Sequence, residues 1–199
     1  MEKRDWKLFW QQYRNTETQE EKDLFFQVGK TIDKNAVSQV IFEEMIQDIK
    51  LKLKLSISDT MLEMCCGNGL LSKPLGKFVN ELYAFDFTER LIETAKKFKQ
   101  STNIIYQVGD AKGDIKTLFD YKKEPNKFLM NDSLGYFNPS ELSKIVEQIN
   151  DRPFYFYITG IPSDPLKWNF YNTEERKSRY KELHQSGDNH NDGIGRWWT

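Results

Sequence analysis

An apolar segment that runs straight into a glycine turn constrains the fold of this chain more than any other feature. Residues 61–71 read MLEMCCGNGLL, with a strand-like start, Gly67 and Gly69 in the middle and the first residues of a helix at the end. A side chain in such a turn would keep the backbone away from a ligand, and the first amides of the helix supply hydrogen-bond donors. The segment predicts a cradle for a small molecule that carries hydroxyls or anionic groups.

A second apolar segment, residues 81–85, ends in an acid, Asp86. A carboxylate about 20 residues beyond a glycine turn is suited to accept hydrogen bonds from ribose hydroxyls. A Gly-x-Gly turn alone is weak evidence, because many such matches are ordinary tight turns. Together with Asp86, the turn favours an adenosine cofactor.

The sequence lacks two other nucleotide-binding motifs. Ser72 stands where the dinucleotide fingerprint G-x-G-x-x-G needs its third glycine, which counts against a nicotinamide enzyme. The phosphate loop G-x-x-x-x-G-K-[ST] occurs nowhere in the chain, and the turn is followed by Leu70 and Leu71 instead of lysine. ATP or GTP hydrolysis therefore has no motif to support it.

With these features the sequence resembles the class I S-adenosylmethionine-dependent methyltransferases. The first motif of that family is an acid followed by spaced glycines, and here it corresponds to Glu63, Cys65, Gly67 and Gly69, with Cys65 in the first glycine position. The resemblance covers roughly residues 36–160. It implies S-adenosyl-L-methionine as cofactor and S-adenosyl-L-homocysteine as product.

The resemblance also implies roles for later residues. In that family the acid after the second strand holds the ribose beside the adenine, a turn after the third strand meets the adenine edge, and the end of the fourth strand lines the methionine end. An amino-terminal helical segment often lies over the cofactor, so Trp10 or Tyr13 is a candidate ligand contact and Lys30 a candidate for the methionine carboxylate. The remaining positions that correspond are Asp86, Phe87, Gly109, Asp110, Ala111 and Asn131, the last followed by Asp132 and Ser133.

Strand-like and helix-like segments alternate along the chain, which predicts an α/β fold: a Rossmann-like, mainly parallel sheet with helices on both faces. The expected strands lie near 60–65, 81–86, 103–108, 126–131 and 153–159, and the expected helices near 69–79, 88–99, 111–119 and 139–149. One domain, 1–199, is expected. It comprises a helical extension over 1–50, a cofactor-binding core over 51–160 and a substrate-side segment over 161–199.

The resembling family normally completes a seven-stranded sheet with two further strands, and no candidate for either follows residue 160. We expect either that a carboxyl-terminal portion is absent or that another chain completes the sheet, because an exposed edge strand invites pairing. The oligomeric state stays open.

The composition limits the kinds of partner that the protein is expected to bind. Lys plus Arg number 29 and Asp plus Glu 30, so no basic field favours nucleic acid. Neither a signal-peptide core nor eighteen consecutive apolar residues occur, which predicts a cytoplasmic protein without a membrane partner. The adjacent cysteines, Cys65 and Cys66, and only two histidines offer no spacing for a metal site.

Methyl transfer needs mainly alignment, because the sulfonium already activates the methyl group, although a hydroxyl nucleophile also needs a base. His184 and His190 are candidate bases, and Asp188 is a candidate to orient or replace them. We expect a small polar acceptor with a hydroxyl or amine, such as a sugar or polysaccharide precursor, as in similar bacterial methyltransferases. The alternatives are a noncatalytic S-adenosylmethionine- or adenosine-binding protein and, less favoured, a nicotinamide-dependent oxidoreductase.

Overall fold

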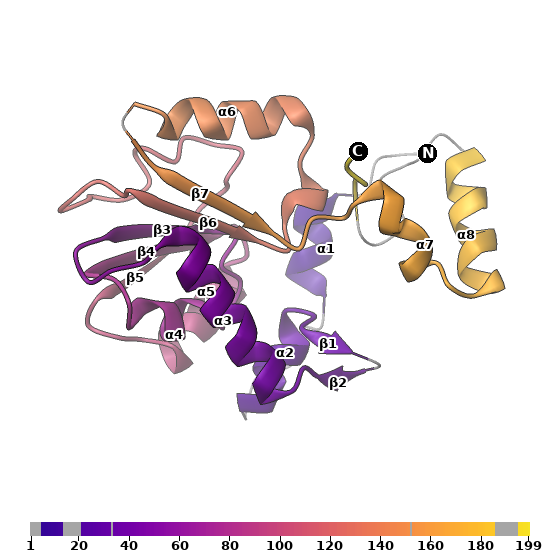
Figure 1. The fold of residues 1–199 in the computed structure, drawn as a ribbon, viewed down its shortest axis with the longest axis horizontal. Helices are drawn as coiled ribbons and strands as arrows, with labels where there is room; N and C mark the ends of the chain where they lie inside the picture. Colours follow the sequence, from indigo (N-terminus) through magenta and orange to yellow (C-terminus); the bar gives the residue numbers. More distant parts are fainter. Residues whose placement is uncertain (1–4, 14–20, 33, 152, 186–194) are drawn as a thin grey trace.

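The structure is a computed structural model that describes residues 5–13, 21–32, 34–151, 153–185 and 195–199 (Figure 1). Within these ranges the elements follow in the order α1 (Trp6–Gln12), α2 (Glu21–Gln27), β1 (Thr31–Ile32), β2 (Asn35–Ala36), α3 (Gln39–Leu53), β3 (Thr60–Met64), α4 (Ser72–Gly76), β4 (Glu81–Asp86), α5 (Glu89–Phe98), β5 (Ile104–Val108), β6 (Lys127–Asn131), η1 (Leu134–Tyr136), α6 (Pro139–Ile149), β7 (Tyr155–Thr159), η2 (Asp164–Leu166), α7 (Lys167–Phe170) and α8 (Glu174–Gln185).

Five parallel strands form the central sheet in the order β5-β4-β3-β6-β7. The strand predictions and the predicted Rossmann-like α/β fold are confirmed. Because all five strands are parallel, their carboxyl ends meet at one edge of the sheet, and the register places Met64 beside both Phe85 and Met130. In the ranges described, no sixth strand joins this sheet.

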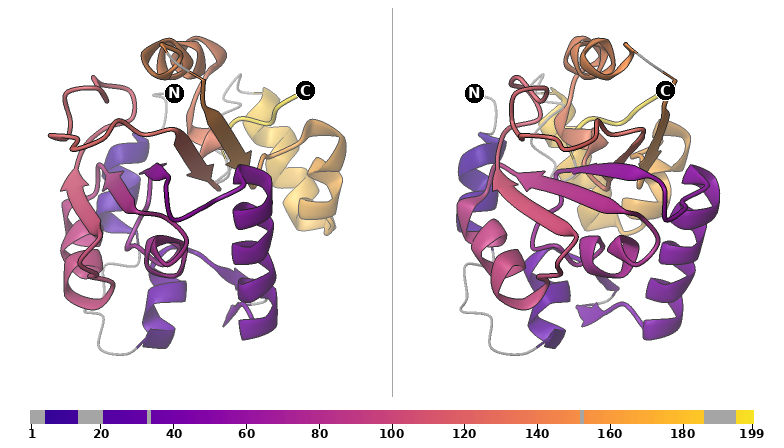
Figure 2. Two further views of the ribbon diagram at one scale, coloured as in Figure 1. Left: turned by 60° about the vertical axis from the view of Figure 1, so that its left-hand side comes forward. Right: turned by 90° about the vertical axis from the view of Figure 1, so that its left-hand side faces the viewer.

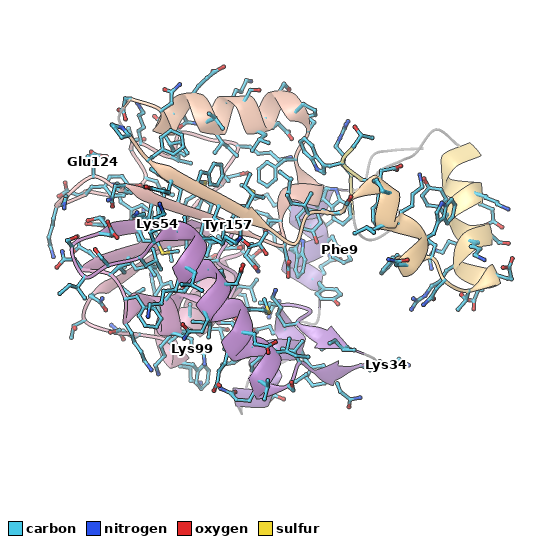
Figure 3. The ribbon with its side chains drawn as sticks, in the orientation of Figure 1. Phe9, Lys34, Lys54, Lys99, Glu124 and Tyr157 are labelled. Carbon is cyan, nitrogen blue, oxygen red and sulfur yellow. The ribbon has the colours of Figure 1, made fainter. Side chains whose placement is uncertain are left out.

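Helices cover both faces of the sheet (Figures 1 and 2). Alternate residues of the strands point to opposite faces, so neighbours such as Met61 and Leu62 enter different hydrophobic cores. The core with Met61 includes buried side chains of α3, α4 and α5, whereas the core with Leu62 includes those of α6 and of the loop before β6. Tyr157 of β7 also donates a hydrogen bond from its hydroxyl to Asp48 Oδ2 in α3, at 2.5 Å (Figure 3).

The helix expected near 111–119 is wrong. This segment is an irregular loop in which Asp110 Oδ1 accepts from the Lys112 amide and Asp114 Oδ1 from the Lys116 amide. Such local side-chain bonds offer the backbone an alternative to a helix. The apolar residues that imitated a helical pattern, Ile115 among them, are anchored in the core instead.

Two other segments differ in extent from the prediction. The amino-terminal extension contains helices α1, α2 and α3, but α2 and α3 are separated by the small antiparallel hairpin β1-β2. Lys34, in the turn of this hairpin, has a left-handed backbone, with φ of 65° (Figure 3). Helix α4 is shorter than expected: it begins at Ser72 and ends at Gly76.

Beyond β7, helices α7 and α8 pack against each other through Trp168, Tyr171 and Tyr180, with ring centroids 4.7–5.3 Å apart in the pairs with Tyr180. Figure 1 shows this pair projecting away from the sheet. Residues 195–199 return to η1, where the Arg196 amide donates to the Gly135 carbonyl at 2.6 Å. Among the described helices, none is long and apolar enough to cross a membrane.

Candidate functional site

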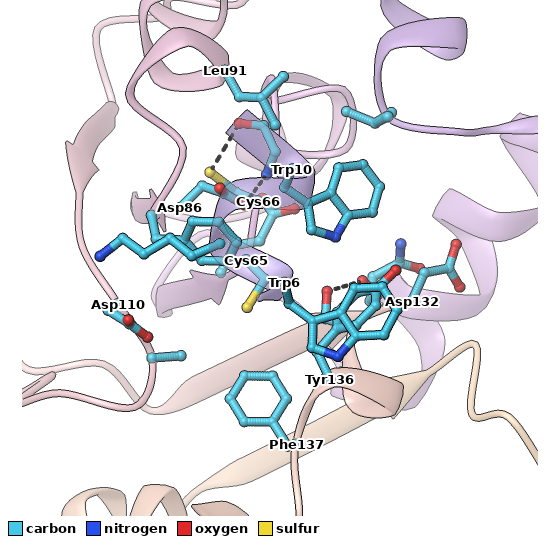
Figure 4. Close-up of a pocket in the computed structure, with 18 of the residues that line it drawn as sticks. Trp6, Trp10, Cys65, Cys66, Asp86, Leu91, Asp110, Asp132, Tyr136 and Phe137 are labelled. Atoms are coloured by element: carbon cyan, nitrogen blue, oxygen red, sulfur yellow. Dashed lines mark hydrogen bonds between the residues drawn. The ribbon is translucent and has the colours of Figure 1, made fainter. Parts of the chain in front are cut away.

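A cavity of about 350 Å³ lies at the carboxyl ends of the strands. Residues at the ends of β3, β4 and β6 line it, and α1 contributes Trp6 and Trp10 from the other side (Figure 4). Ligands of open parallel sheets bind outside the carboxyl ends of the strands, so the cavity occupies the position where this fold is expected to hold one.

The glycine turn after β3 has a left-handed backbone at three positions. Cys65, Gly67 and Gly69 have φ values of 57°, 57° and 72°. At Gly67 a Cβ would lie 2.9 Å from Val28 Cγ1, and at Gly69 a Cβ would lie 2.7 Å from the Tyr106 hydroxyl oxygen. Both glycines are therefore needed for backbone angle and for space, while Cys65 adopts a conformation that is strained for any residue with a side chain.

Asp86 closes this turn from the neighbouring strand. Its Oδ2 accepts from the Gly67 amide at 3.1 Å, and its Oδ1 accepts from the Thr88 amide at 2.8 Å. Burial raises the pKa of Asp86, although these amide hydrogen bonds oppose the rise. Each carboxylate oxygen has a second lone pair, so Asp86 can support the turn and still accept from a ligand hydroxyl.

Glu63 is a second buried acid on the cavity lining, only 2% exposed. The Ser72 hydroxyl donates to Glu63 Oε2 at 2.6 Å. Burial raises the pKa of Glu63 to about 7, against the lowering effect of this hydrogen bond. Ser72, which breaks the dinucleotide fingerprint, thus serves as the hydrogen-bond donor of Glu63, a pairing that sequence spacing did not reveal.

Nine of the twelve predicted cofactor residues line the cavity: Glu63, Cys65, Gly67, Asp86, Phe87, Asp110, Ala111, Asn131 and Lys30. Gly69, Gly109 and Tyr13 do not. Gly69 shapes the turn, and the Gly109 amide donates to the Asp86 carbonyl at 3.0 Å, which joins the ends of β5 and β4. The Tyr13 carbonyl accepts from Arg90 Nη2 at 3.0 Å. The proposed contacts of all twelve with a cofactor stay predictions.

Two residues of the cavity lining form an ion pair. Lys30, after α2, pairs with the carboxylate of Asp132, directly after β6. Asp132 has a left-handed backbone, with φ of 52°, and a Cβ on Gly160 would lie 1.6 Å from its Oδ1. Gly160 is therefore needed to leave room for this carboxylate. The sequence named Asn131, Asp132 and Ser133 at this strand end, and all three line the cavity.

Three aromatic rings gather at one end of the cavity. Trp6 and Trp10 of α1 approach Tyr136 of η1, with ring centroids 4.7 Å and 6.0 Å apart. Figure 4 shows these rings with Asp132 on one side of Cys65, and Asp86 and Asp110 on the other. We call the part lined by Trp6, Trp10, Asn131, Asp132 and Tyr136 the aromatic end of the cavity.

The candidate bases come late in the sequence, at the end of α8 and after it. His190 and Asp188 fall outside the described residues. His184 belongs to α8, but its side chain lies outside the described part of the structure. Their proposed roles stay predictions.

Solved structures share this fold. The chain resembles a Haemonchus contortus phosphoethanolamine N-methyltransferase solved with phosphoethanolamine and S-adenosylhomocysteine (TM-score 0.56, 19% identity, 76% of this chain and 30% of that one). It also resembles a Methanobacterium thermoautotrophicum precorrin 8W decarboxylase (0.50, 19%, 85% and 81%) and a putative methyltransferase of Bacillus halodurans (0.50, 16%, 72% and 68%). No protein-family model and no curated protein matches the chain.

These likenesses show the fold. At identities of only 16–19%, the TM-scores of 0.50 and 0.56 show that the chain has the Rossmann-like architecture of these solved structures. The chain spans less than a third of the Haemonchus enzyme, so that enzyme's whole architecture is not represented.

Proposed function

We propose that this protein is an S-adenosylmethionine-dependent methyltransferase that acts on a small polar acceptor with a hydroxyl or amine, sugars and polysaccharide precursors included. One observation carries the proposal: the buried Asp86 carboxylate accepts a hydrogen bond from the Gly67 amide. The acid at the end of β4 and the glycine turn after β3 therefore form one wall of the cavity. A ribose-binding acid and a turn that admits a ligand to the backbone are thus joined in one unit.

The lining fits such a cofactor in chemistry and size. Asp86 offers acceptors for ribose hydroxyls, Phe87 and Ala111 offer apolar surface for an adenine, and Lys30 offers a cation for the methionine carboxylate. Asn131 Oδ1 is buried without a hydrogen-bond partner in the described structure, and it would accept a hydrogen bond from the ammonium group of the methionine moiety. A volume of about 350 Å³ lies within the range of small-molecule sites.

The bound cofactor would supply an activated methyl group, and the protein would supply alignment. The residues that line the cavity would hold the acceptor in line with the methyl group. Such positioning is worth several orders of magnitude in rate for a reaction of two substrates. Helix α1, which covers the aromatic end, would keep water away from the reacting atoms. A cavity covered in this way suits a small acceptor.

Calorimetric titration with S-adenosylmethionine, S-adenosylhomocysteine and NADH tests the proposal. Both sulfur compounds should bind with micromolar Kd, and NADH should not bind. Binding of NADH alone would favour the oxidoreductase, and no binding at all would contradict the proposed function. Binding of the sulfur compounds without S-adenosylhomocysteine production from any hydroxyl or amine acceptor would favour a noncatalytic binding protein.

A further inference from the structure

We propose that the methyl acceptor is an amine, recognised as a cation at the aromatic end of the cavity. This inference rests on the proposed methyl transfer and makes the acceptor class specific. It follows from two properties of this end, the rings and the carboxylate of Asp132, and from the charge of the whole cavity lining.

The three rings form a part of the cavity wall that attracts a positive charge. Trp6 and Tyr136 are tilted by 51°, and Trp10 and Tyr136 by 78°, so the rings do not stack as one flat layer. All three line the cavity. A cation within about 6 Å of an indole or phenol ring centroid is attracted by the ring quadrupole, most strongly by tryptophan. A neutral alcohol gains no such attraction.

The polar groups at the same end accept hydrogen bonds. Asp132 is half exposed and reaches the cavity from a left-handed backbone for which Gly160 leaves room. An ammonium group donates up to three hydrogen bonds and carries a positive charge, whereas a neutral hydroxyl donates only one, so an amine suits this carboxylate better.

The charge of the lining points the same way. Lys30 pairs with Asp132, but the lining as a whole carries more acids than bases even with Glu63 counted as neutral. With S-adenosylhomocysteine bound, which carries no net charge, an anionic ligand would add to this negative excess, whereas a cation offsets it. The acids are Asp5, Glu63, Asp86, Asp110 and Asp132, and the bases are Lys7, Lys30 and Lys112.

The transfer step balances with an amine. The bound ammonium first releases one proton to water. The nitrogen lone pair then forms the new N–C bond while the C–S bond of the methyl donor breaks, and that electron pair stays on sulfur. The products are a methylated ammonium and S-adenosylhomocysteine, with one proton released.

Binding of a matched pair of probes tests the cation preference. Protein saturated with S-adenosylhomocysteine is titrated by calorimetry with choline and with its neutral isostere 3,3-dimethylbutan-1-ol. Choline should bind at least tenfold more tightly. Asp132→Asn should reduce this ratio several-fold without unfolding the site, because asparagine tolerates a left-handed backbone as aspartate does. Trp6→Leu should also reduce it, and Trp168→Leu, in α7 outside the cavity, should leave it unchanged.

A turnover assay gives a second readout. With 2-phenylethylamine and 2-phenylethanol at equal concentration, S-adenosylhomocysteine should form only with the amine, and mass spectrometry should detect the N-methylated product. Equal affinity for choline and its isostere, or preferred methylation of the alcohol, overturns this inference while the proposed function stands. Absence of S-adenosylhomocysteine binding at the outset overturns both.

Discussion

At the scale of single residues, two buried carboxylates, Asp86 and Glu63, dominate the chemistry of the cavity. Asp86 is held by two backbone amides, and Glu63 by one hydroxyl. An acid with charge-assisted bonds from amides is fixed in place, whereas an acid that is buried with a single weak donor tends to keep its proton. The two acids therefore lead to different predictions.

Asp86→Ala should weaken S-adenosylhomocysteine binding by about 1.5–3 kcal/mol, or roughly 10- to 150-fold in Kd, because hydrogen bonds to a charged group are lost. The variant also loses backbone caps at Gly67 and Thr88. Asp114→Ala is the matched control, since Asp114 caps backbone amides outside the cavity. Calorimetry should show weakened binding only for the Asp86 variant, and an unchanged Kd would refute the ribose assignment.

Glu63→Gln should change the pH dependence of stability. Because burial raises the pKa of Glu63 from 4.5 to about 7, the folded protein holds a proton between these pH values that the unfolded chain has lost. The free energy of unfolding of the wild type should therefore fall by about 2–3 kcal/mol from pH 5 to pH 8 through this group. Glutamine has no such titration.

Urea unfolding of both proteins at pH 5 and pH 8 measures this effect. The stability of Glu63→Gln relative to wild type should increase by that amount at pH 8. Glu44→Gln, on an exposed face of α3, is the control and should show the same difference from wild type at both pH values. A constant difference for Glu63→Gln would contradict the buried, proton-holding state.

At the scale of elements, α1 lies over the cavity at the surface of the molecule. None of its residues is buried, and its Asp5 cap is exposed. It is held by ring contacts with Tyr136 and by Arg90, whose Nη2 donates to the Tyr13 carbonyl just past the helix. The Nε and Nη1 atoms of Arg90 are buried and have no partner among the described residues.

Arg90→Gln should therefore loosen α1. Loss of a hydrogen bond from a charged donor costs about 1.5 kcal/mol at the low end of the usual range, which corresponds to roughly tenfold faster amide exchange by local opening. Hydrogen exchange with mass spectrometry should show this increase in α1 and no change in β3. Arg176→Gln is the control, because Arg176 Nη1 donates to the Phe170 carbonyl at 3.1 Å, away from α1. Equal exchange of α1 in wild type and Arg90→Gln would show that the rings alone hold the helix.

Some elements of the fold could be predicted from the sequence, and others could not. The five strands were predictable because a strand covered on both faces is a continuous apolar run. The positions of Gly67 and Asp86 beside the cavity were predictable because local spacing places them at strand ends, whereas Glu63 was implied by the family resemblance. The loop over 111–119 was not predictable, because the spacing of its apolar residues imitates an amphipathic helix. The contact of Trp6 with Tyr136 joins residues far apart in the chain, which no local pattern encodes.

In the whole molecule, the cavity joins parts of the chain that otherwise belong to separate layers. Its lining includes α1, the turn before β1, the ends of three parallel strands and η1. The last described residues support η1 from behind, where Trp198 Nε1 donates to the Leu134 carbonyl at 3.2 Å. A ligand in the cavity therefore bridges the amino-terminal extension and the sheet.

This arrangement predicts that cofactor binding stabilises the entire fold as one unit. At a concentration of 100 times its Kd, S-adenosylhomocysteine should add about 2.7 kcal/mol to the free energy of unfolding. For a domain of this size, that corresponds to a rise in Tm of about 5–10 °C in a single calorimetric transition. NADH at the same concentration should leave Tm unchanged, and Asp86→Ala should show a smaller rise at the same ligand concentration. If S-adenosylhomocysteine bound but only part of the unfolding transition moved, the cavity would belong to one layer alone, and α1 and the Lys30 turn would not share in holding the ligand.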